Sequence, residues 1–423
     1  MEQKTLLKNK KNQGNGGETM AKRDDSVKKK VPELRFKGFT DDWEERKLGD
    51  ITKISTGKLD ANAMVENGKY DFYTSGIKKY RTDVAAFEGP SITIAGNGAT
   101  VGYMHLADNK FNAYQRTYVL QEFLVDRSFI FSEIGNKLPK KIKQEARTGN
   151  IPYIVMDMLT ELKLSIPQNN SEQQKIGSFF KQLDETIALH QRKLDLLKEQ
   201  KKGFLQKMFP KNGEKVPELR FAGFADDWEQ RKFKDIIEKL TGGASIKPSD
   251  YLEEGIRTIP KGAVNSTGLA DLSGSKYISE EFYESNKSSH VSTNNLVTSL
   301  RDLVPSAPNM GRIVRIAGED EDFLMPQGVY KLELFDGMDE EFLIAFSNSD
   351  KYRKIISSKK NGSTQVHIRN EEFLNIDIEL PFSEEQKQIG SFFKQLDNSI
   401  ALHQRKLDLL KEQKKGFLQK MFV

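Results

Sequence analysis

The chain has no cysteine among its 423 residues, and it has only five histidines and two tryptophans. The lack of cysteine excludes disulfide bonds, thiolate zinc sites and cysteine nucleophiles. No apolar run approaches the ~18 residues that a membrane span needs, and the N-terminal sequence lacks the apolar stretch of a signal peptide. We therefore expect a soluble, cytoplasmic protein, and the hydrophobic content of 37% is enough to build real cores.

Motifs for catalysis are also missing. The sequence contains no [ND]PP[FY] methyltransferase tetrapeptide, no G-x-x-x-x-G-K-[ST] phosphate loop, no H-E-x-x-H and no recognisable nuclease cluster. The segment GNGATVG at 96–102 lacks the lysine of a phosphate loop, so it predicts a tight turn between strands. We expect no catalytic residues, no metal site and no cofactor bound by this chain.

Positive charge is concentrated at one end. Residues 1–30 hold nine Lys or Arg against four Asp or Glu, an excess equal to the whole net charge of +5. The rest of the chain is nearly neutral, so an argument for nucleic-acid binding must rest on local clusters. Residues 1–30 are predicted to be a disordered basic tail, and the choice between Met1 and Met20 as the natural start stays open.

The chain contains two copies of the same frame. The segment 176–209 returns at 389–422 with only two of 34 positions changed, and the block VPELRFKGFTDDWEERKLGDI from Val31 returns in similar form from Val216. The residues between these blocks differ almost completely. Such a long period predicts two whole domains, each followed by the same helix, with pseudo-two-fold symmetry.

The repeated segment has the spacing of a coiled-coil helix. Apolar residues recur every four and three positions over more than four heptads. Two seam positions are polar in both copies. They are occupied by His190 and Lys201 in the first copy and by His403 and Lys414 in the second, and we expect these residues to set the register. The predicted helix-pairing seam consists of Ile176, Phe180, Leu183, Ile187, Leu194, Leu197, Phe204 and Met208, and of Ile389, Phe393, Leu396, Ile400, Leu407, Leu410, Phe417 and Met421.

The two helices are expected to pair with each other, because neither can bury such a seam alone. Ser171 with Gln174 and Ser383 with Gln386 fit the capping box that begins a helix. Each helix would be about 58 Å long at ~1.5 Å per residue. We favour an antiparallel coiled coil, which would give each end one variable domain.

The variable segments alternate short apolar strands with turns rich in Gly, Asn and Pro, which predicts α+β domains. Their loops carry side chains suited to DNA phosphates and base edges, since Arg and Lys can reach guanine or phosphate and Asn and Gln can reach adenine. The DNA-binding candidates are Lys58, Lys78, Lys79, Tyr80, Arg81, Asn97, Gln115, Arg116, Arg147 and Asn150, and then Lys247, Lys261, Asn265, Arg301, Asn309, Arg312, Lys359, Lys360, Thr364 and Gln365.

The ordered set of features resembles the specificity (S) subunit of a type I restriction-modification system. Each half has W-E-x-R-K-[LF]-x-D-I at Trp43 or Trp228, a Gly-rich variable domain, a strand ending in proline, and S-E-x-Q-K before a long heptad helix. The resemblance implies a basic tail (1–30), target-recognition domain 1 (31–170), conserved helical region 1 (171–210), target-recognition domain 2 (211–382) and conserved helical region 2 (383–423).

The resemblance also implies a function. Each recognition domain would read one half of a bipartite double-stranded DNA target, and the paired helices would set the spacer between the halves. The chain itself would be non-catalytic. Two modification (methyltransferase) subunits, which use S-adenosylmethionine, and restriction (endonuclease and translocase) subunits, which use ATP and Mg, would join it.

Two alternatives stay open at this point. The chain is a coiled-coil adaptor that binds proteins and not DNA, or it serves a single-polypeptide restriction-methylase in place of separate subunits. The bases recognised and the spacer length cannot be read from the sequence.

Overall fold

The structure of the protein is a computed structural model that describes residues 6–8, 31–145, 152–211 and 213–423. It divides the chain into two compact units: unit 1 is Met1–His190 with Lys406–Val423, and unit 2 is Gln191–Arg405. The candidates Arg147 and Asn150 lie outside the described residues, as does the predicted tail apart from residues 6–8. In the described part, no helix is both long enough and apolar enough to cross a membrane.

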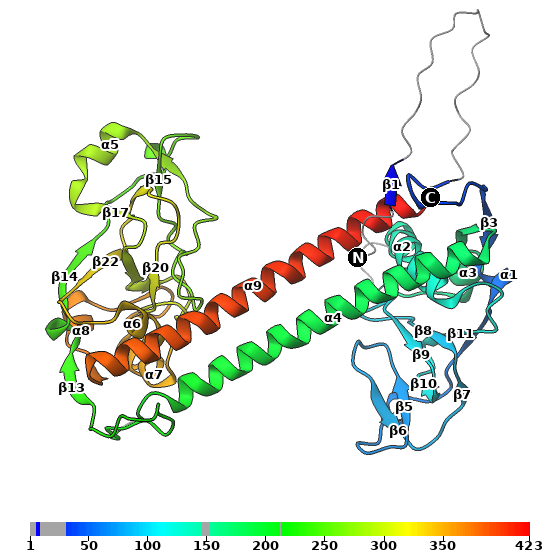
Figure 1. Ribbon diagram of the computed structural model, residues 1–423, viewed down its shortest axis with the longest axis horizontal. Helices are drawn as coiled ribbons and strands as arrows, with labels where there is room; N and C mark the ends of the chain where they lie inside the picture. The colour runs from blue at the N-terminus through cyan, green and yellow to red at the C-terminus, as the bar shows by residue number, and fades with distance from the viewer. Residues whose placement is uncertain (1–5, 9–30, 146–151, 212) are drawn as a thin grey trace, which may run out of the picture. The chain divides into compact units, whose positions relative to one another are not determined.

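Unit 1 is a mixed α+β domain (Figure 1). Its strands are β1 (Leu6–Lys8), β2 (Leu34–Phe36), β3 (Trp43–Lys47), β4 (Lys53–Thr56), β5 (Tyr70–Tyr73), β6 (Tyr80–Thr82), β7 (Phe87–Glu88), β8 (Ser91–Ala95), β9 (Met104–Ala107), β10 (Lys110–Ala113), β11 (Thr117–Gln121) and β12 (Lys163–Pro167). Its helices, apart from the long ones described below, are α1 (Leu48–Ile51), α2 (Arg127–Glu145) and α3 (Met156–Thr160). The strands form two four-stranded sheets, β6-β5-β10-β7 and β4-β11-β8-β9, and the pairs β12-β3 and β1-β2.

Unit 2 repeats this plan with a different sequence. Its strands are β13 (Glu229–Lys232), β14 (Ile237–Gly242), β15 (Ile256–Thr258), β16 (Tyr277–Ile278), β17 (His290–Ser292), β18 (Leu296–Ser299), β19 (Arg301–Asp302), β20 (Ile313–Arg315), β21 (Asp322–Leu324), β22 (Val329–Leu334), β23 (Val366–His367) and β24 (Asp377–Leu380). Its short helices are α5 (Glu280–Ser285), α6 (Glu340–Phe346), α7 (Asp350–Lys359) and α8 (Asn370–Leu374).

The sheets of the two units correspond strand by strand. The order β14-β22-β18-β20 matches β4-β11-β8-β9, and β16-β15-β21-β17 matches β6-β5-β10-β7. In both units the second sheet contains one parallel pair, β10 with β5 and β21 with β15. The prediction of two mixed α+β domains is therefore confirmed, and the segment 96–102 is the turn between β8 and β9, as predicted.

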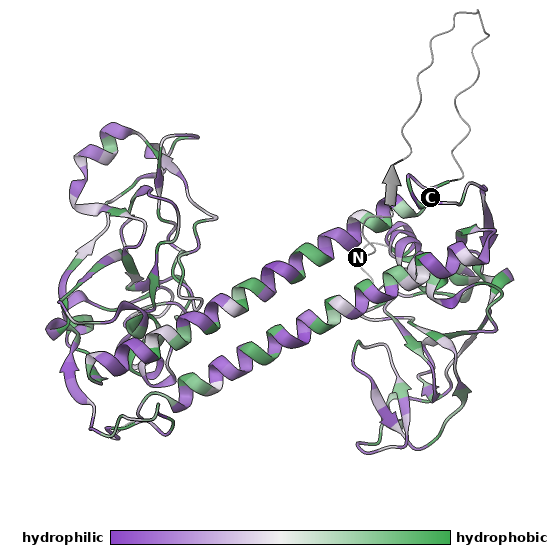
Figure 2. Cartoon of the chain, in the orientation of Figure 1, coloured by the Kyte–Doolittle hydropathy of each residue, from purple (hydrophilic) through white to green (hydrophobic). Residues whose placement is uncertain are grey.

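The two long helices are α4 (Asn170–Lys207) and α9 (Ser383–Met421). Each contributes residues to both units, and apolar positions recur along each of them (Figure 2). In unit 1 the Phe179 ring lies 5.0 Å from that of Phe417. In unit 2 the Phe204 ring lies 4.9 Å from that of Phe392.

Every residue of the predicted seam is buried or half-buried, and equivalent residues of α4 and α9 have the same burial class. Ile176, Phe180, Leu194 and Met208 are buried, and the other seam residues of α4 are mostly half-buried. The same alternation holds from Ile389 to Met421. The duplicated sequence thus has a duplicated pattern of burial.

The repeated N-terminal block fastens each domain to the start of a long helix. The Arg35 guanidinium pairs with both carboxylate oxygens of Glu172 at 2.6 and 2.8 Å, and Arg220 pairs with Glu385 at 2.7 Å to each oxygen. These bidentate pairs are almost completely buried, with side chains 8% and 0% exposed in the first. Both halves thus contain the block together with the helical carboxylate that it binds.

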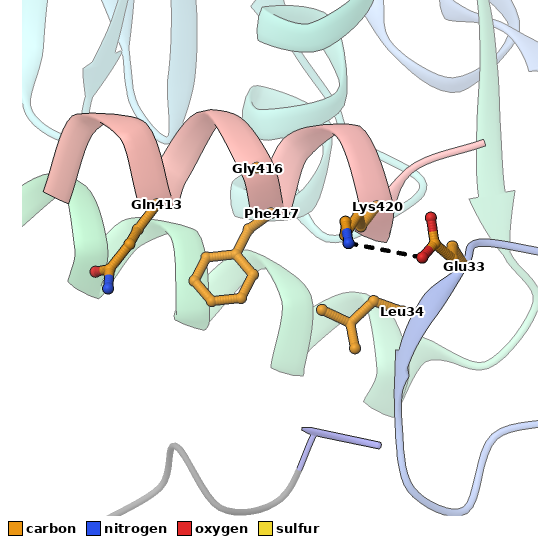
Figure 3. A pocket seen from close by; sticks show the side chains of 6 residues that line it. All are labelled: Glu33, Leu34, Gln413, Gly416, Phe417 and Lys420. Atoms are coloured by element: carbon orange, nitrogen blue, oxygen red, sulfur yellow. Dashed lines mark ion pairs between the residues drawn. The ribbon is translucent and has the colours of Figure 1, made fainter. Parts of the chain in front are cut away.

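A shallow cavity of about 310 Å³ lies in unit 1 where this block meets the C-terminal end of α9 (Figure 3). The Lys420 ammonium lies 3.6 Å from the Glu33 carboxylate at its rim. Leu34 and Phe417 make its lining largely apolar. The cavity belongs to the fastening of the block and offers no cluster of reactive side chains.

The predicted capping boxes are wrong. Helix α4 begins at Asn170, and the side chain of Asn169 accepts the hydrogen bond from Ser171 N at 2.9 Å. Gln174 is exposed, whereas its neighbour Gln173 is buried and accepts from Asp126 N at 2.9 Å. Gln173 therefore joins the helix to the domain, and Gln174 does not cap the helix.

Gln386 plays the role of Gln173 in unit 2. Its Oε1 accepts from Asp339 N at 3.2 Å, and its Nε2 donates to Pro381 O at 2.9 Å. It therefore does not cap α9 together with Ser383. The equivalent hydrogen bonds of Gln173 and Gln386 explain why a glutamine occurs at this position in both copies.

The core of each unit is completed by the end of a long helix. In unit 1, Phe422 packs 6.2 Å from Trp43 and 5.7 Å from Phe129, measured between ring centroids. In unit 2, Phe209 packs 6.2 Å from Trp228. Both phenylalanines are buried and lie just beyond the last residue of their helix, so each repeated helix is followed by a side chain that fills a domain core.

Candidate nucleic-acid interface

Five loops of unit 1 meet at one edge of the domain, and we call them loop cluster 1. Backbone hydrogen bonds hold them together: Gly57 N to Thr117 O (3.0 Å), Gln115 N to Leu59 O (2.9 Å), Gly96 N to Arg116 O (2.9 Å), Ile154 N to Gly96 O (2.7 Å) and Tyr114 N to Tyr73 O (2.9 Å). The cluster comprises residues 57–60, 73–79, 96–102, 114–116 and 152–154. It gathers segments that are far apart in the sequence onto one rigid frame.

Close backbone approach explains a glycine at this junction. A Cβ atom added at Gly57 would lie 2.0 Å from Ala113 O, and one at Gly96 would lie 2.2 Å from Arg116 O. Any side chain would push the loops apart, because real Cβ contacts are never this short. The frame therefore requires glycine where the strands end and the loops begin.

Loop cluster 1 brings together six of the predicted DNA-binding residues. Five of them are exposed, and Asn97 is half-buried, with its Oδ1 accepting from Ser75 Oγ at 2.6 Å. The Lys79 ammonium lies 5.3 Å from the centre of the Tyr73 ring. The six are Lys58, Lys78, Lys79, Asn97, Gln115 and Arg116.

Two other predicted residues, Tyr80 and Arg81, belong to β6 and not to the loops. The Arg81 guanidinium donates to Asp71 Oδ1 at 2.5 Å, to Gly68 O at 2.9 Å and to Lys69 O at 2.8 Å. These three bonds hold the guanidinium within the domain, although the side chain is 44% exposed. Tyr80 lies beneath the Lys78 ammonium, 5.5 Å from the ring centre.

Sequence reasoning missed four aromatic residues at this edge. Tyr153 is 57% exposed and pairs with Asn97 in an antiparallel bridge. The His105 ring lies between those of Tyr73 and Tyr103, at 5.1 and 4.9 Å. Burial lowers the pKa of His105 below its usual value. No spacing signal links Tyr153 to Asn97, because only the fold makes them neighbours.

Unit 2 repeats this frame in loop cluster 2. The corresponding bonds are Gly243 N to Val329 O (3.0 Å), Gln327 N to Ala244 O (2.7 Å), Leu300 N to Gly328 O (3.2 Å) and Ile368 N to Leu300 O (3.0 Å). The cluster comprises residues 243–247, 300–311, 326–328 and 359–368. Two domains that share almost no sequence thus share four of these five backbone hydrogen bonds; the fifth has no counterpart because Pro326, at the position of Tyr114, has no N–H.

The frame identifies equivalent positions, and their side chains differ. Asn97 bridges to Tyr153 in unit 1, and Arg301 bridges to His367 in unit 2. The residue before each bridge donates its N–H to a carbonyl oxygen of the frame, which belongs to Arg116 in unit 1 and to Gly328 in unit 2. Asn97 is thus equivalent to Arg301, and Arg116 is equivalent to Gly328. Each cluster has one exposed arginine, but the two arginines occupy different positions of the frame.

Loop cluster 2 contains or borders most candidates of the second domain. Lys247, Arg301, Lys359, Thr364 and Gln365 are exposed, and Asn309 is half-buried. Lys360 is half-buried and donates from Nζ to Pro305 O at 2.7 Å.

Lys261 and Asn265 lie on a separate loop, which joins β20 through a bridge between Leu269 and Arg315. The Asn265 amide is used in its own turn, donating to Leu269 O at 2.9 Å. The frame does not bring these two candidates to the cluster.

Arg312 faces the domain rather than solvent. Burial, together with the neighbouring Arg353 cation, lowers the pKa of Arg312 to about 10. Its Nε donates to Pro308 O at 2.9 Å, and it also bonds the side chain of Asn348. In this structure Arg312 braces the loop that carries Asn309.

The loop clusters hold charged, amide and aromatic side chains but no constellation for chemistry. Within the described ranges, no group of three or more His, Cys, Asp or Glu side chains could hold a metal ion. The arrangement offers donors and aromatic faces on a fixed backbone, which suits recognition of a polyanion with distinguishable edges.

Comparison with known proteins places this architecture. Residues 40–199 and 225–412 match the family described as type I restriction modification DNA specificity domain. The EcoDI specificity subunit of Escherichia coli is 32% identical over 182 residues, which are 42% of this chain and 40% of that protein. The chain thus spans less than half of that relative's length.

A second relative aligns along nearly the whole chain. The MjaVIII specificity subunit of Methanocaldococcus jannaschii is 23% identical over 399 residues, 89% of this chain and 91% of that protein. The crystal structure of a type I restriction-modification S subunit from M. genitalium has a TM-score of 0.67 at 17% identity, covering 93% of this chain and 99% of that one. At this identity the likeness shows the fold. Because the family match covers most of the chain and occurs twice, the protein belongs to the family of type I restriction-modification specificity subunits.

Proposed function

We propose that each unit reads one half of a bipartite DNA target through its loop cluster, and that the chain does no chemistry itself. One observation carries this proposal: the two clusters share their backbone frame and differ in the side chains that the frame presents. A common frame gives both units the same approach to the DNA backbone, whereas different side chains let them prefer different bases.

The proposal includes partners. Two modification subunits would supply S-adenosylmethionine and methylate adenine, and restriction subunits would supply ATP hydrolysis and cleavage. The near-identity of the two helices supports a pair of equal partner subunits, because equal sequences present equal surfaces. A cytoplasmic location belongs to the same proposal, since the target is cellular DNA.

We further propose that α4 and α9 pair along their whole seam as an antiparallel coiled coil that fixes the spacer between the half-sites. The order of contacts within each unit supports this proposal. In unit 1, Phe180 contacts Phe422 and Asp184 pairs with Lys414, so numbers rise along one helix as they fall along the other. In unit 2, Lys201 pairs with Asp397 and Phe204 contacts Phe392, again in opposite order.

The proposal is tested by co-expressing the chain with its modification subunit in a methylation-free host and mapping methylated adenines. We expect a split motif with a fixed gap. Exchange of residues 45–167 for another recognition domain should change one half-site and keep the other half and the gap. Insertion of one heptad into both helices should lengthen the gap and keep both half-sites.

Two results would contradict the proposal. Loss of both half-sites after the exchange of residues 45–167 would show that the units do not read separately. Absence of methylation with a demonstrably active modification subunit would favour the protein-binding adaptor. Co-expression with a single-polypeptide restriction-methylase distinguishes the remaining alternative, in which one partner chain supplies all the chemistry.

A further inference from the structure

The loop that follows β19 in unit 2 is longer than its counterpart in unit 1. Gly102 N donates to Ala95 O at 2.8 Å, and Gly311 N donates to Ser299 O at 2.7 Å, so these glycines end equivalent loops. The span from Arg301 to Gly311 is five residues longer than the span from Asn97 to Gly102. Unit 2 therefore carries an insertion within its loop cluster.

Side chains of the domain hold this insertion from below. Arg353 lies at its base, Arg312 beside it, and Lys360 on the neighbouring hairpin. Their donors bond the carbonyl oxygens of Met310 (2.6 Å), Ala307 (2.9 Å), Pro308 (2.9 Å) and Pro305 (2.7 Å). The Asp302 carboxylate accepts from the backbone N–H groups of Val304 and Asn309 at 3.2 and 3.3 Å.

The base of the insertion is fixed in the core. Ala307 and Met310 are buried with the apolar residues of unit 2. Ala307 has φ +49°, a left-handed conformation that disfavours residues with a Cβ atom. Such a conformation persists only where surrounding contacts impose it, so the loop is held in one shape before any ligand arrives.

The tip of the insertion is apolar and exposed. Leu303 is 71% exposed and Val304 is 44% exposed, and Pro305 and Ser306 beside them are also exposed. The loop thus holds two adjacent aliphatic side chains, Leu303 and Val304, in solvent above a fixed base. The turn 98–101, the counterpart of the insertion in unit 1, has no such side chain, since its residues are Gly, Ala, Thr and the half-buried Val101. The exposed Ile77 of loop cluster 1 (58%) lies on a different loop, 73–79.

We propose that Leu303 is a wedge that inserts between stacked base pairs in the half-site read by unit 2. The inference rests on the proposed function. DNA is favoured over an apolar protein pocket because the tip lies among cations: Arg301 is two residues away, and Lys359 and Lys360 border the loop. Rigid leucine side chains that part base steps are a known means of bending DNA.

The consequence is an asymmetric complex. The half-site of unit 2 is unstacked at the step that Leu303 enters, and unit 1 has no insertion equivalent to the one that carries Leu303. Sequence preference at that step then comes from the ease of unstacking and not from a hydrogen bond to a base.

The test uses the chain assembled with its modification subunits and a duplex containing the mapped target. 2-Aminopurine replaces each adenine in turn, apart from those that are methylated. We expect a severalfold rise in fluorescence on binding at one step in the half-site of unit 2 and none in that of unit 1. Leu303→Ala should abolish the rise, and Leu303→Phe should retain it.

Leu252→Ala is the matched control, because Leu252 is an exposed leucine of unit 2 outside loop cluster 2. It should leave the fluorescence unchanged. Binding without a rise at any step of the half-site, or a rise that survives Leu303→Ala, overturns the wedge and leaves the proposed function standing. Loss of assembly in Leu303→Ala but not in Leu252→Ala identifies a protein contact and overturns it as well. Failure of the wild-type assembly to bind any duplex overturns the proposed function itself.

Discussion

The Lys201 ammonium lies 2.5 Å from the Asp397 carboxylate, joining α4 to α9 within unit 2. Unit 1 contains the same pair with its members exchanged, because Lys414 of α9 lies 2.5 Å from Asp184 of α4. Lys201 and Lys414 occupy one position of the repeat, and the two aspartates occupy another. The seam lysines are thus paired with the facing helix in both units, and their role in setting the register stays a prediction.

Removal of either partner of the Lys201 pair should destabilise unit 2. The side chains are 12% and 22% exposed, so a lone charge would remain poorly solvated. We expect Lys201→Ala and Asp397→Ala each to cost about 1–3 kcal/mol, and the double variant to cost less than their sum. Denaturant unfolding of the four proteins measures the coupling. The exposed Lys202→Ala should change stability by less than ~0.5 kcal/mol; strict additivity would show that the pair contributes nothing.

The two kinds of glycine in the repeated helices should respond in opposite ways to alanine. A Cβ atom at Gly390 would lie 2.2 Å from Asp339 Oδ1 and 2.6 Å from Phe342 N, whereas one at Gly203 would meet nothing within 4 Å. We expect Gly390→Ala to destabilise by about 1–3 kcal/mol through overpacking. Gly203→Ala should stabilise by up to ~1 kcal/mol through helix propensity.

The same pair of substitutions can be repeated in the other unit, with Gly177 as the crowded position and Gly416 as the open one. Thermal unfolding of the four variants gives the comparison. Equal stability of Gly390→Ala and Gly203→Ala would contradict the close approach of α9 to the start of α6.

The stability of unit 1 should depend on pH through Glu133. Burial raises the pKa of Glu133 from 4.5 to about 7, although Lys137 lowers it. Between these values the folded state holds a proton that the unfolded state has lost, so stability falls as pH rises across the range, by about 3 kcal/mol in total.

Glu133→Gln removes this titration while keeping an acceptor for Ser165 N, which now donates to Glu133 at 3.1 Å. The unfolding free energy of the variant, measured between about pH 5 and about pH 8, should therefore fall less than that of the wild type. Glu145→Gln, on the exposed end of α2, should behave like the wild type. Parallel pH profiles for Glu133→Gln and the wild type would rule out this titration.

Arg116 and Arg301 should each govern one base pair of their own half-site. Both are exposed, and they occupy different positions of the shared backbone frame. Since arginine reads guanine O6 and N7, Arg116→Gln and Arg301→Gln should each relax one position by about 1–3 kcal/mol of discrimination. Arg231→Gln, an exposed arginine of β13 paired with Glu229, is the control. Methylation mapping shows which half changes, and relaxation of both halves by one substitution would contradict the assignment.

The fold was predictable where the sequence repeats itself. The heptad spacing from Ile176 to Met208 located both helices, and the duplication implied two domains of one type. Capping was not predictable, because Gln173 and Gln386 serve contacts with Asp126 and Asp339 that no local pattern reveals.

The candidate site was predictable only in part. Residue chemistry selected Arg116 and Arg301, but it also selected Arg81 and Arg312, whose donors the structure uses within the domain. Hydrogen bonding within the domain decides between these cases, because Arg81 is as exposed as Arg116 yet bonds Asp71, and such bonds depend on tertiary packing. Tyr153 was missed since its partner Asn97 becomes a neighbour only after folding.

Because Met421 and Phe422 are buried in the core of unit 1, unit 1 cannot complete its core until these two residues have been synthesised. The ribosome makes residues 31–167 first, yet Trp43 and Phe129 lack their last packing partner until the final residues of α9 emerge. Unit 2, by contrast, has every segment of Gln191–Arg405 available before translation ends. The domain that is translated first is thus the one that matures last, and a prematurely terminated chain would be left with an open core.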